Sequence, residues 1–196
     1  MNTDKNLTSV LYKGEIIEWT GKAEPFRLLD GANKNSIQLR WIICAASAIG
    51  IVALYIYFAI QMSADIVIPI VLFFAFIPAM AAIRPSMDRI DILSKVDFAI
   101  TDQRVITFKS SQVHAYMAFD DLDKARIIES GDGAGDIMLG SSALNTPEKR
   151  RRFVTIVPQK NTDEMGQQTV TGMIFYNIKE IDAVKSLLAA KGVAFE

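Results

Sequence analysis

Two long uncharged segments constrain what this chain can fold into more than any other feature of its sequence. Trp41–Ile60 runs for about 20 residues without a charge, and Ile66–Ile83 for about 18. A helix rises about 1.5 Å per residue, so each segment approaches the roughly 30 Å thickness of a bilayer's hydrocarbon core. Neither segment has the polar face that a soluble surface helix would show. The sequence therefore predicts two transmembrane helices, at 41–60 and 66–83.

The flanks of these segments predict how they are oriented. Residues 61–65 are too few for anything except a tight turn, and they contain no Lys or Arg, whereas Arg40 precedes the first segment and Arg84 follows the second. The positive-inside rule then predicts a multi-pass protein of the cell's inner (cytoplasmic) membrane with both termini in the cytoplasm. We expect Arg40, Trp41 and Arg84 to anchor the helix ends at the membrane interface.

Composition excludes some classes of partner and of processing. The formal net charge is −1, so no global field favours nucleic acid, and we expect no nucleic-acid partner. The one cysteine, Cys44, excludes an intramolecular disulfide. The first forty residues lack the apolar stretch of a cleavable signal peptide, so the first helix is expected to act as its own insertion signal.

The remainder of the chain is typical of a small β-rich domain. We expect a cytoplasmic segment at 1–40 with a short strand at Glu15–Thr20, the helical hairpin at 41–83 and a cytoplasmic domain at 84–196. After Pro85, short alternating runs separated by Gly, Asp, Asn and Pro favour an antiparallel barrel or sandwich. The predicted strands are Val96–Thr101, Arg104–Lys109, Val113–Phe119, Ala125–Glu129, Ile137–Leu139, Phe153–Val157 and Thr171–Tyr176.

A final helix is predicted after these strands. Asn177 is suited to cap it, with Glu180 three residues later as in a capping box, and an apolar stripe follows. Lys191 and Gly192 are the residue types expected at its end. The predicted fold class is therefore α+β: a two-helix transmembrane hairpin and an antiparallel β-barrel or sandwich capped by a C-terminal α-helix.

Several short motifs occur in an order that resembles a known family. They are a G-E-x-x-x-W-x-G opening at Gly14–Gly21, a T-x-x-R-V-I strand end at Thr101–Ile106, a D-L segment at Asp121–Ile127, a G-x-G-x-I turn at Gly133–Ile137 and a helix entry at Phe175–Val184. Together with the hairpin they resemble bacterial membrane proteins with a pleckstrin-homology (PH) domain, the YdbT-like family. The resemblance implies a PH-like barrel and makes self-association plausible.

The densest basic run, Lys149–Arg152, is the main candidate binding site. Lys149, Arg150, Arg151 and Arg152 directly precede a predicted strand, where they could contact anionic lipid headgroups. The alternative is a solvated loop tip partly neutralised by Glu148. If Val96–Thr101 and Arg104–Lys109 are the first two strands of a PH-like domain, the turn between them is too short for the phosphoinositide site of eukaryotic PH domains.

Other polar motifs favour structural roles over catalysis. The glycine-rich stretch 131–136 lacks the spacing of a phosphate-binding or calcium-binding loop and is predicted to be a hairpin turn. His114 is the only histidine, and the acidic residues around Asp121 read as a polar turn. We therefore expect a protein that is not an enzyme and has no metal or cofactor.

These observations leave three functional hypotheses. The leading one is a membrane-anchored scaffold or assembly factor that offers a strand edge, or the groove beside its C-terminal helix, to a protein partner or to a second copy of itself. The second is a sensor of anionic lipid headgroups that uses the basic run. The third is a small pore or transporter subunit, which the absence of ionisable residues in both apolar segments disfavours.

Overall fold

A computed structural model describes residues 11–29, 31, 33–131, 133–162 and 166–196. The chain forms two compact units, of which one is Arg27–Met87 and the other combines the segment up to Phe26 with Asp88–Glu196. The first unit is helical and the second contains all the described strands.

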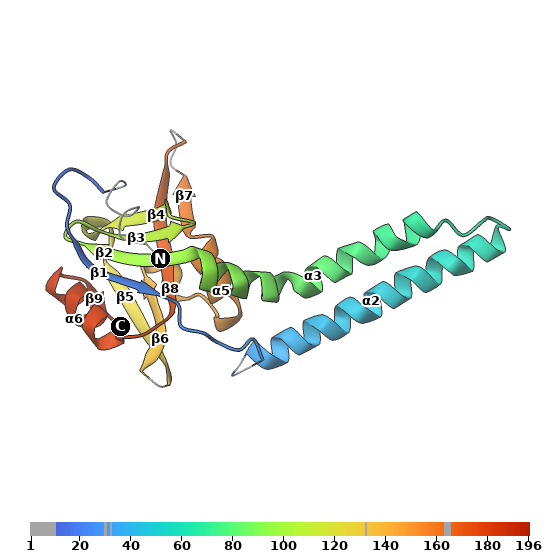
Figure 1. Ribbon diagram of the computed structural model, residues 1–196, viewed down its shortest axis with the longest axis horizontal. Helices are drawn as coiled ribbons and strands as arrows, with labels where there is room; N and C mark the ends of the chain where they lie inside the picture. The colour runs from blue at the N-terminus through green and yellow to red at the C-terminus, as the bar shows by residue number, and fades with distance from the viewer. Residues whose placement is uncertain (1–10, 30, 32, 132, 163–165) are drawn as a thin grey trace. The chain divides into compact units, whose positions relative to one another are not determined.

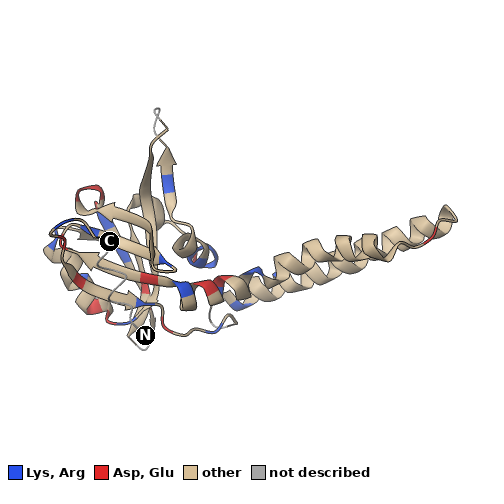
Figure 2. Ribbon diagram, turned by 45° about the horizontal axis from the view of Figure 1, so that its top comes forward, with Lys and Arg blue, Asp and Glu red and all other residues tan. Residues whose placement is uncertain are grey.

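The helical unit is built from two long apolar helices that run side by side (Figure 1). They are α2 (Asn33–Gln61) and α3 (Ile68–Lys95), and both are long and apolar enough to cross a membrane. Few residues of their most apolar windows are buried, which is unlike the core helix of a soluble protein. Figure 2 shows long stretches of both helices without charged residues.

Both helices extend beyond the predicted segments. Helix α2 begins eight residues before Trp41, and α3 continues past Ile83 to Lys95 with Pro85 inside it. The expected change of pattern directly after Pro85 was therefore wrong. A proline removes one helical hydrogen bond, but the residues that follow it here are compatible with a helix and carry the helix into the second unit.

Polar contacts link α2 to α3 and to the turn that precedes it. Trp41 Nε1 donates a hydrogen bond to the carbonyl oxygen of Ala82 over 2.9 Å. Near the turn, the backbone N–H of Val67 donates to the hydroxyl oxygen of Tyr55 over 3.0 Å. A hydrogen bond that is made internally removes the cost of leaving that group unpaired in an apolar medium.

The first sheet joins strands from both sides of the hairpin. Its order is β1 (Ile17–Lys22), β2 (Val96–Thr101), β3 (Arg104–Lys109) and β4 (Gln112–Ala118), with antiparallel pairing throughout. The predicted N-terminal strand therefore joins the sheet, where it pairs with β2. Both chain segments that flank the hairpin thus belong to one sheet.

The second sheet contains five strands in the order β7-β8-β6-β5-β9. Its members are β5 (Lys124–Gly131), β6 (Ala134–Leu139), β7 (Gln159–Thr162), β8 (Gln168–Ile178) and the short β9 (Ala194–Phe195). Pairing is antiparallel except between β9 and β5. The glycine-rich stretch does form the β5–β6 turn, where Gly133 has a φ of 72°. Strands β7 and β9 were not predicted, because short polar or terminal strands lack an alternating apolar signal.

Two short helices and a 3-10 turn lie between the strands. They are α4 (Ser141–Leu144), α5 (Glu148–Ile156) and the turn at Phe119–Asp121. The predicted strand Phe153–Val157 was wrong, because this segment forms the second half of α5 and its C-cap. Pro147 and Glu148 suit a helix start, and burial of the apolar residues on one side of the helix outweighs their β propensity.

The C-terminal helix is α6 (Ile181–Ala190), but its start differs from the prediction. Asn177 still belongs to β8, and its side-chain amide donates to the carbonyl oxygen of Glu24 over 3.0 Å. Glu180 occupies the N-cap in a left-handed conformation without a side-chain cap. The capping-box prediction was therefore wrong. The end of the helix agrees with expectation, since Lys191 is the C-cap and Gly192 follows at a φ of 86°.

The core of the β-rich unit lies between the two sheets, which do not close into one barrel. A group of aromatic rings crosses it. The ring centroid of Phe175 in β8 lies 4.6 Å from that of Phe98 in β2 and 6.1 Å from that of Trp19 in β1. Gly21 is required beside Trp19, because a Cβ there would lie 2.3 Å from the indole ring. Helix α6 contributes buried Val184 and Leu188 to this core.

A buried ion pair fixes the segment before β1 to the β2–β3 turn. Arg104 Nε and Nη2 donate to the two carboxylate oxygens of Glu15 over 2.8 and 2.9 Å. Thr101 Oγ1 and the backbone N–H of Tyr12 also donate to Glu15, over 2.8 and 2.7 Å. The Glu15 side chain is fully buried and that of Arg104 is 5% exposed.

Aromatic rings complete the environment of the guanidinium group. Arg104 Cζ lies 3.8 Å from the ring centroid of Tyr12 and 4.7 Å from that of Tyr116. Burial alone would raise the pKa of Glu15, but the hydrogen bonds from Arg104, Tyr12 and Thr101 outweigh it and lower the pKa. The carboxylate is therefore ionised and fully bonded in the folded protein.

We predict that Glu15→Gln destabilises the β-rich unit by about 3–5 kcal/mol, because it leaves the buried charge of Arg104 uncompensated. Thermal unfolding of the full chain in detergent, followed by Trp fluorescence, measures the change. The matched control is Glu18→Gln in the next strand, whose partly exposed pair with Lys191 should contribute about 0–1 kcal/mol. Equal losses of stability in the two variants would contradict the role of the buried Glu15–Arg104 pair.

The lowered pKa of Glu15 also predicts an acid-dependent loss of stability. Its contribution is fully present above the unfolded-state value near 4.5 and is lost as pH falls through the lower folded-state pKa. Asp136 has the opposite effect on how stability changes with pH, because burial raises its pKa. Wild type should therefore lose more stability below pH 4.5 than Glu15→Gln does, as measured by urea unfolding at several pH values. Parallel pH profiles would exclude this role of Glu15.

Candidate functional site

The basic run divides into an exposed half and a buried half because it lies on a helix. Lys149 and Arg150 are exposed, whereas Arg152 is only 6% exposed and the Arg151 side chain only 13%. Residues two positions apart on a helix point to different sides, whereas residues of a loop tip need not alternate in this way. Of the four residues in the lipid-contact hypothesis, only Lys149 and Arg150 are therefore exposed enough to reach lipid headgroups.

The buried half takes part in a polar network with the second sheet. Arg151 Nη1 donates to Asp136 Oδ2 over 3.1 Å, and the backbone N–H of Asn177 donates to Asp136 Oδ1 over 3.0 Å. Burial raises the pKa of Asp136 despite these bonds. Burial is also the main reason why the pKa of neighbouring Tyr176 rises to about 12, although a hydrogen bond from Arg152 opposes it. This network attaches α5 to β6 and β8.

His114 has a structural role in the same region. Its Nε2 lies 2.7 Å from the carbonyl oxygen of Ile156, which can only accept, so this nitrogen donates the hydrogen bond. The contact ties β4 of the first sheet to the last turn of α5. Among the described residues, no group of three or more His, Cys, Asp or Glu side chains is placed to hold a metal ion.

The predicted membrane anchors differ in their surroundings. Arg40 and Arg84 are exposed on α2 and α3, as an interfacial position requires. The Trp41 ring is partly exposed, but its N–H is already bonded to Ala82, so it also holds the two helices together. Aromatic and basic residues where apolar helices begin and end are typical of membrane-interface anchors.

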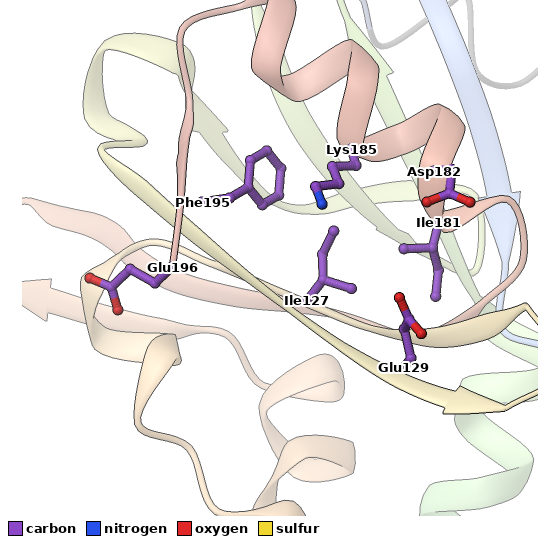
Figure 3. Close-up of a pocket in the computed structure, with 7 residues that line it drawn as sticks. All are labelled: Ile127, Glu129, Ile181, Asp182, Lys185, Phe195 and Glu196. Atoms are coloured by element: carbon purple, nitrogen blue, oxygen red, sulfur yellow. The ribbon is translucent and has the colours of Figure 1, made fainter.

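An open pocket of about 160 Å³ lies between β5 and α6, beside the C-terminal strand. Figure 3 shows Ile127 and Glu129 on the strand facing Ile181 and Lys185 on the helix. The full lining is Ile127, Glu129, Ile181, Asp182, Lys185, Phe195 and Glu196. It therefore combines apolar side chains with three carboxylates and one ammonium group.

Two of these carboxylates are available to a ligand. Glu196 is paired with Lys124 and Arg126 over 2.9 and 3.0 Å. Glu129 and Asp182, in contrast, form no ion pair with any residue that the structure describes. The Lys185 ammonium group lies 6.0 Å from the Phe195 ring centroid. The pocket is thus electrostatically suited to a cationic group next to an apolar one.

The backbone edge of β5 beside this pocket is only partly covered. Strand β9 pairs with Lys124 and Ala125, and the N–H of Glu196 donates to the carbonyl oxygen of Ala125 over 3.0 Å. Within the described part of the chain, no strand pairs with β5 on this side beyond Ala125. Alternate residues of a strand direct their N–H and C=O groups to the same edge, so Ile127 and Glu129 continue the row that Ala125 begins.

Comparisons of the sequence with protein-family models and curated proteins, and of the fold with solved structures, found no match. Sequence reasoning anticipated a groove beside the C-terminal helix but not its lining, since Glu129 and Asp182 lie far apart in the chain. It also missed the division of the basic run, although the helix formers Glu148–Arg152 after Pro147 were a signal for α5.

We predict that the two halves of the basic run respond differently to charge reversal. Arg151→Glu with Arg152→Glu should lower the free energy of unfolding by more than about 3 kcal/mol, because it places new carboxylates beside buried Asp136. Lys149→Glu with Arg150→Glu should change it by less than about 0.5 kcal/mol, because both side chains are exposed. Thermal unfolding of the full chain distinguishes the two. A large loss in the exposed pair would refute the observed orientation of α5.

Proposed function

We propose that this chain is a membrane-anchored scaffold, similar to bacterial PH-domain proteins, that binds a partner protein in the pocket between β5 and α6. The pocket is the observation that carries the proposal, since it places an apolar surface and two available carboxylates beside an incompletely paired strand edge. An extended segment can add to such an edge through its backbone and insert side chains into the adjoining pocket.

The arrangement of strands and helices supports the PH-like part of the proposal. A four-stranded antiparallel meander, a second sheet and a helix near the C-terminal end are compatible with a PH-like fold, although α5 before β7 and the strand β9 after α6 were not expected from the resemblance. The motif residues also have structural roles. Glu15 pairs with Arg104, the Trp19 ring packs in the core, and Gly21 lacks the Cβ that would clash with that ring.

Membrane anchoring rests on the two apolar helices and on how their flanks are joined. Strand β1 precedes the hairpin and β2 follows it, so their pairing supports an arrangement in which both flanks lie on the same side of the membrane. The distribution of Lys and Arg then favours the cytoplasmic side of the inner membrane. The anchor would hold the pocket close to partners in the same membrane.

The charge of the pocket indicates the chemistry of the partner. Because Glu196 is already paired with Lys124 and Arg126, two carboxylates remain against one ammonium group. This balance favours a segment in which an apolar side chain adjoins Lys or Arg. Ile127 and Ile181 would contact the apolar side chain, and Glu129 with Asp182 would meet the cation. Segments rich in Asp or Glu should bind poorly, because like charges would oppose the carboxylates.

This proposal predicts a partner crosslink at the pocket that depends on its charge. A photo-crosslinking amino acid at Ile127 of the full chain should capture a discrete protein in cells. Glu129→Lys with Asp182→Lys should abolish the product, whereas the control Asp120→Lys with Asp123→Lys, two exposed acids outside the pocket, should retain it. The same probe at exposed Gln112 of β4 measures background.

Two results would count against the proposed docking site. A product that is equally strong at Ile127 and Gln112 would mean that the pocket is not the contact. A product that consists only of two copies of this chain would replace the partner protein with self-association.

A further inference from the structure

Helix α5 presents two different sides to its surroundings. The inward side is part of the core, with Val154, Thr155 and Ile156 buried together with Arg152. The outward side carries Lys149 and Arg150 near its start. Farther along, Phe153 is 39% exposed and Val157, the C-cap residue, is 46% exposed.

The spacing of these outward residues places cations and apolar groups on one face. Residues three or four apart are neighbours on a helix surface, so the basic pair, Phe153 and Val157 form a continuous stripe. Half-buried Glu148 adds one acid at the first turn, which leaves an excess of positive charge on the exposed side. Such a stripe is the pattern of a helix that rests on an anionic bilayer, with apolar side chains among the lipids and cations at the phosphates.

The length of chain between the apolar hairpin and the β-rich unit favours a membrane as the occupant of this face. The apolar segment ends at Ile83, and the β-rich unit begins at Asp88. The four intervening residues span about 6 Å as helix, and α3 passes through them without a break. A surface that is tethered so closely to lipid meets it at a high effective concentration, so even a weak contact is populated.

We propose that the exposed face of α5, formed by Lys149, Arg150, Phe153 and Val157, lies on the anionic headgroups of the membrane that the hairpin crosses. This contact goes beyond the proposed docking function, because it uses none of the residues of the β5–α6 pocket. It depends on membrane insertion but not on a partner protein, so each proposal can fail without the other. Arg151 and Arg152 hold α5 in place through Asp136 and Tyr176 and do not contact lipid.

The test uses the full chain in lipid nanodiscs. Val157→Cys in a Cys44→Ala background is labelled with an apolar, environment-sensitive fluorophore, which preserves an apolar group at the end of the stripe. Discs contain phosphatidylcholine alone or mixed with phosphatidylglycerol, each with or without lipids brominated on their chains as quenchers. We expect blue-shifted emission and bromine quenching in the anionic discs, and neither in the neutral discs.

Charge variants and salt show whether the contact is electrostatic. Lys149→Glu with Arg150→Glu should reduce quenching in anionic discs to the level of neutral discs. The control Lys13→Glu with Lys160→Glu, which reverses two exposed charges outside α5, should leave it unchanged. Raised salt should weaken quenching of the labelled protein that retains Lys149 and Arg150, because exposed charges are screened. Unchanged Trp fluorescence verifies that each variant is folded.

Three results would overturn the proposal. The first is an equal signal in anionic and neutral discs. The second is quenching that survives both the Lys149→Glu, Arg150→Glu variant and high salt. The third is a label that becomes shielded only when a cell extract is added, which would assign the face to a protein.

Discussion

The fold depends on the buried ion pair between Glu15 and Arg104. The two residues lie on opposite sides of the apolar hairpin in the sequence, and their bidentate contact holds the start of β1 against the β2–β3 turn. Both side chains are buried, so each charge requires the other, together with Thr101 and the backbone of Tyr12. Strand β1 lies at the edge of its sheet, where the Trp19 ring and the ion pairs Lys22–Asp97 and Glu18–Lys191 also hold it, but the Glu15–Arg104 pair is the buried one.

Once β1 is fixed, the arrangement of the rest of the β-rich unit follows from packing. Trp19 and Phe98 from the first sheet meet Phe175 from the second, so one aromatic stack determines how the sheets face each other. Polar contacts then help to hold helix α5, among them Arg151 to Asp136 and His114 to the Ile156 carbonyl. The two proposed surfaces, the β5–α6 pocket and the outer face of α5, are parts of this fixed frame that it leaves exposed.

The two surfaces also have opposite charge. The pocket has an excess of carboxylates, whereas the outer face of α5 has an excess of cations beside apolar side chains. An anionic bilayer would attract the second and repel the first. A protein that combines both is suited to rest one face on the membrane while another remains open to a basic segment of a partner.

The sequence by itself determined the features that depend on local composition: the two apolar helices, most strands of the first sheet, the glycine-rich β5–β6 turn and the end of α6 at Lys191 and Gly192. These follow from hydrophobic length, period-two alternation and residues with special backbone preferences. Tertiary structure decided the remainder. The segment Phe153–Val157 has strand propensity, but the Arg151–Asp136 contact and burial against β8 make it helical. Asn177 has the chemistry of a helix cap but instead donates a hydrogen bond to the carbonyl oxygen of Glu24, which follows β1 and lies 153 residues away in the sequence. Half of the basic run is buried because it also has a long-range partner. In each of these cases, the contact with a partner far away in the sequence contributes more to the free energy of folding than the local conformational preference of the residue does.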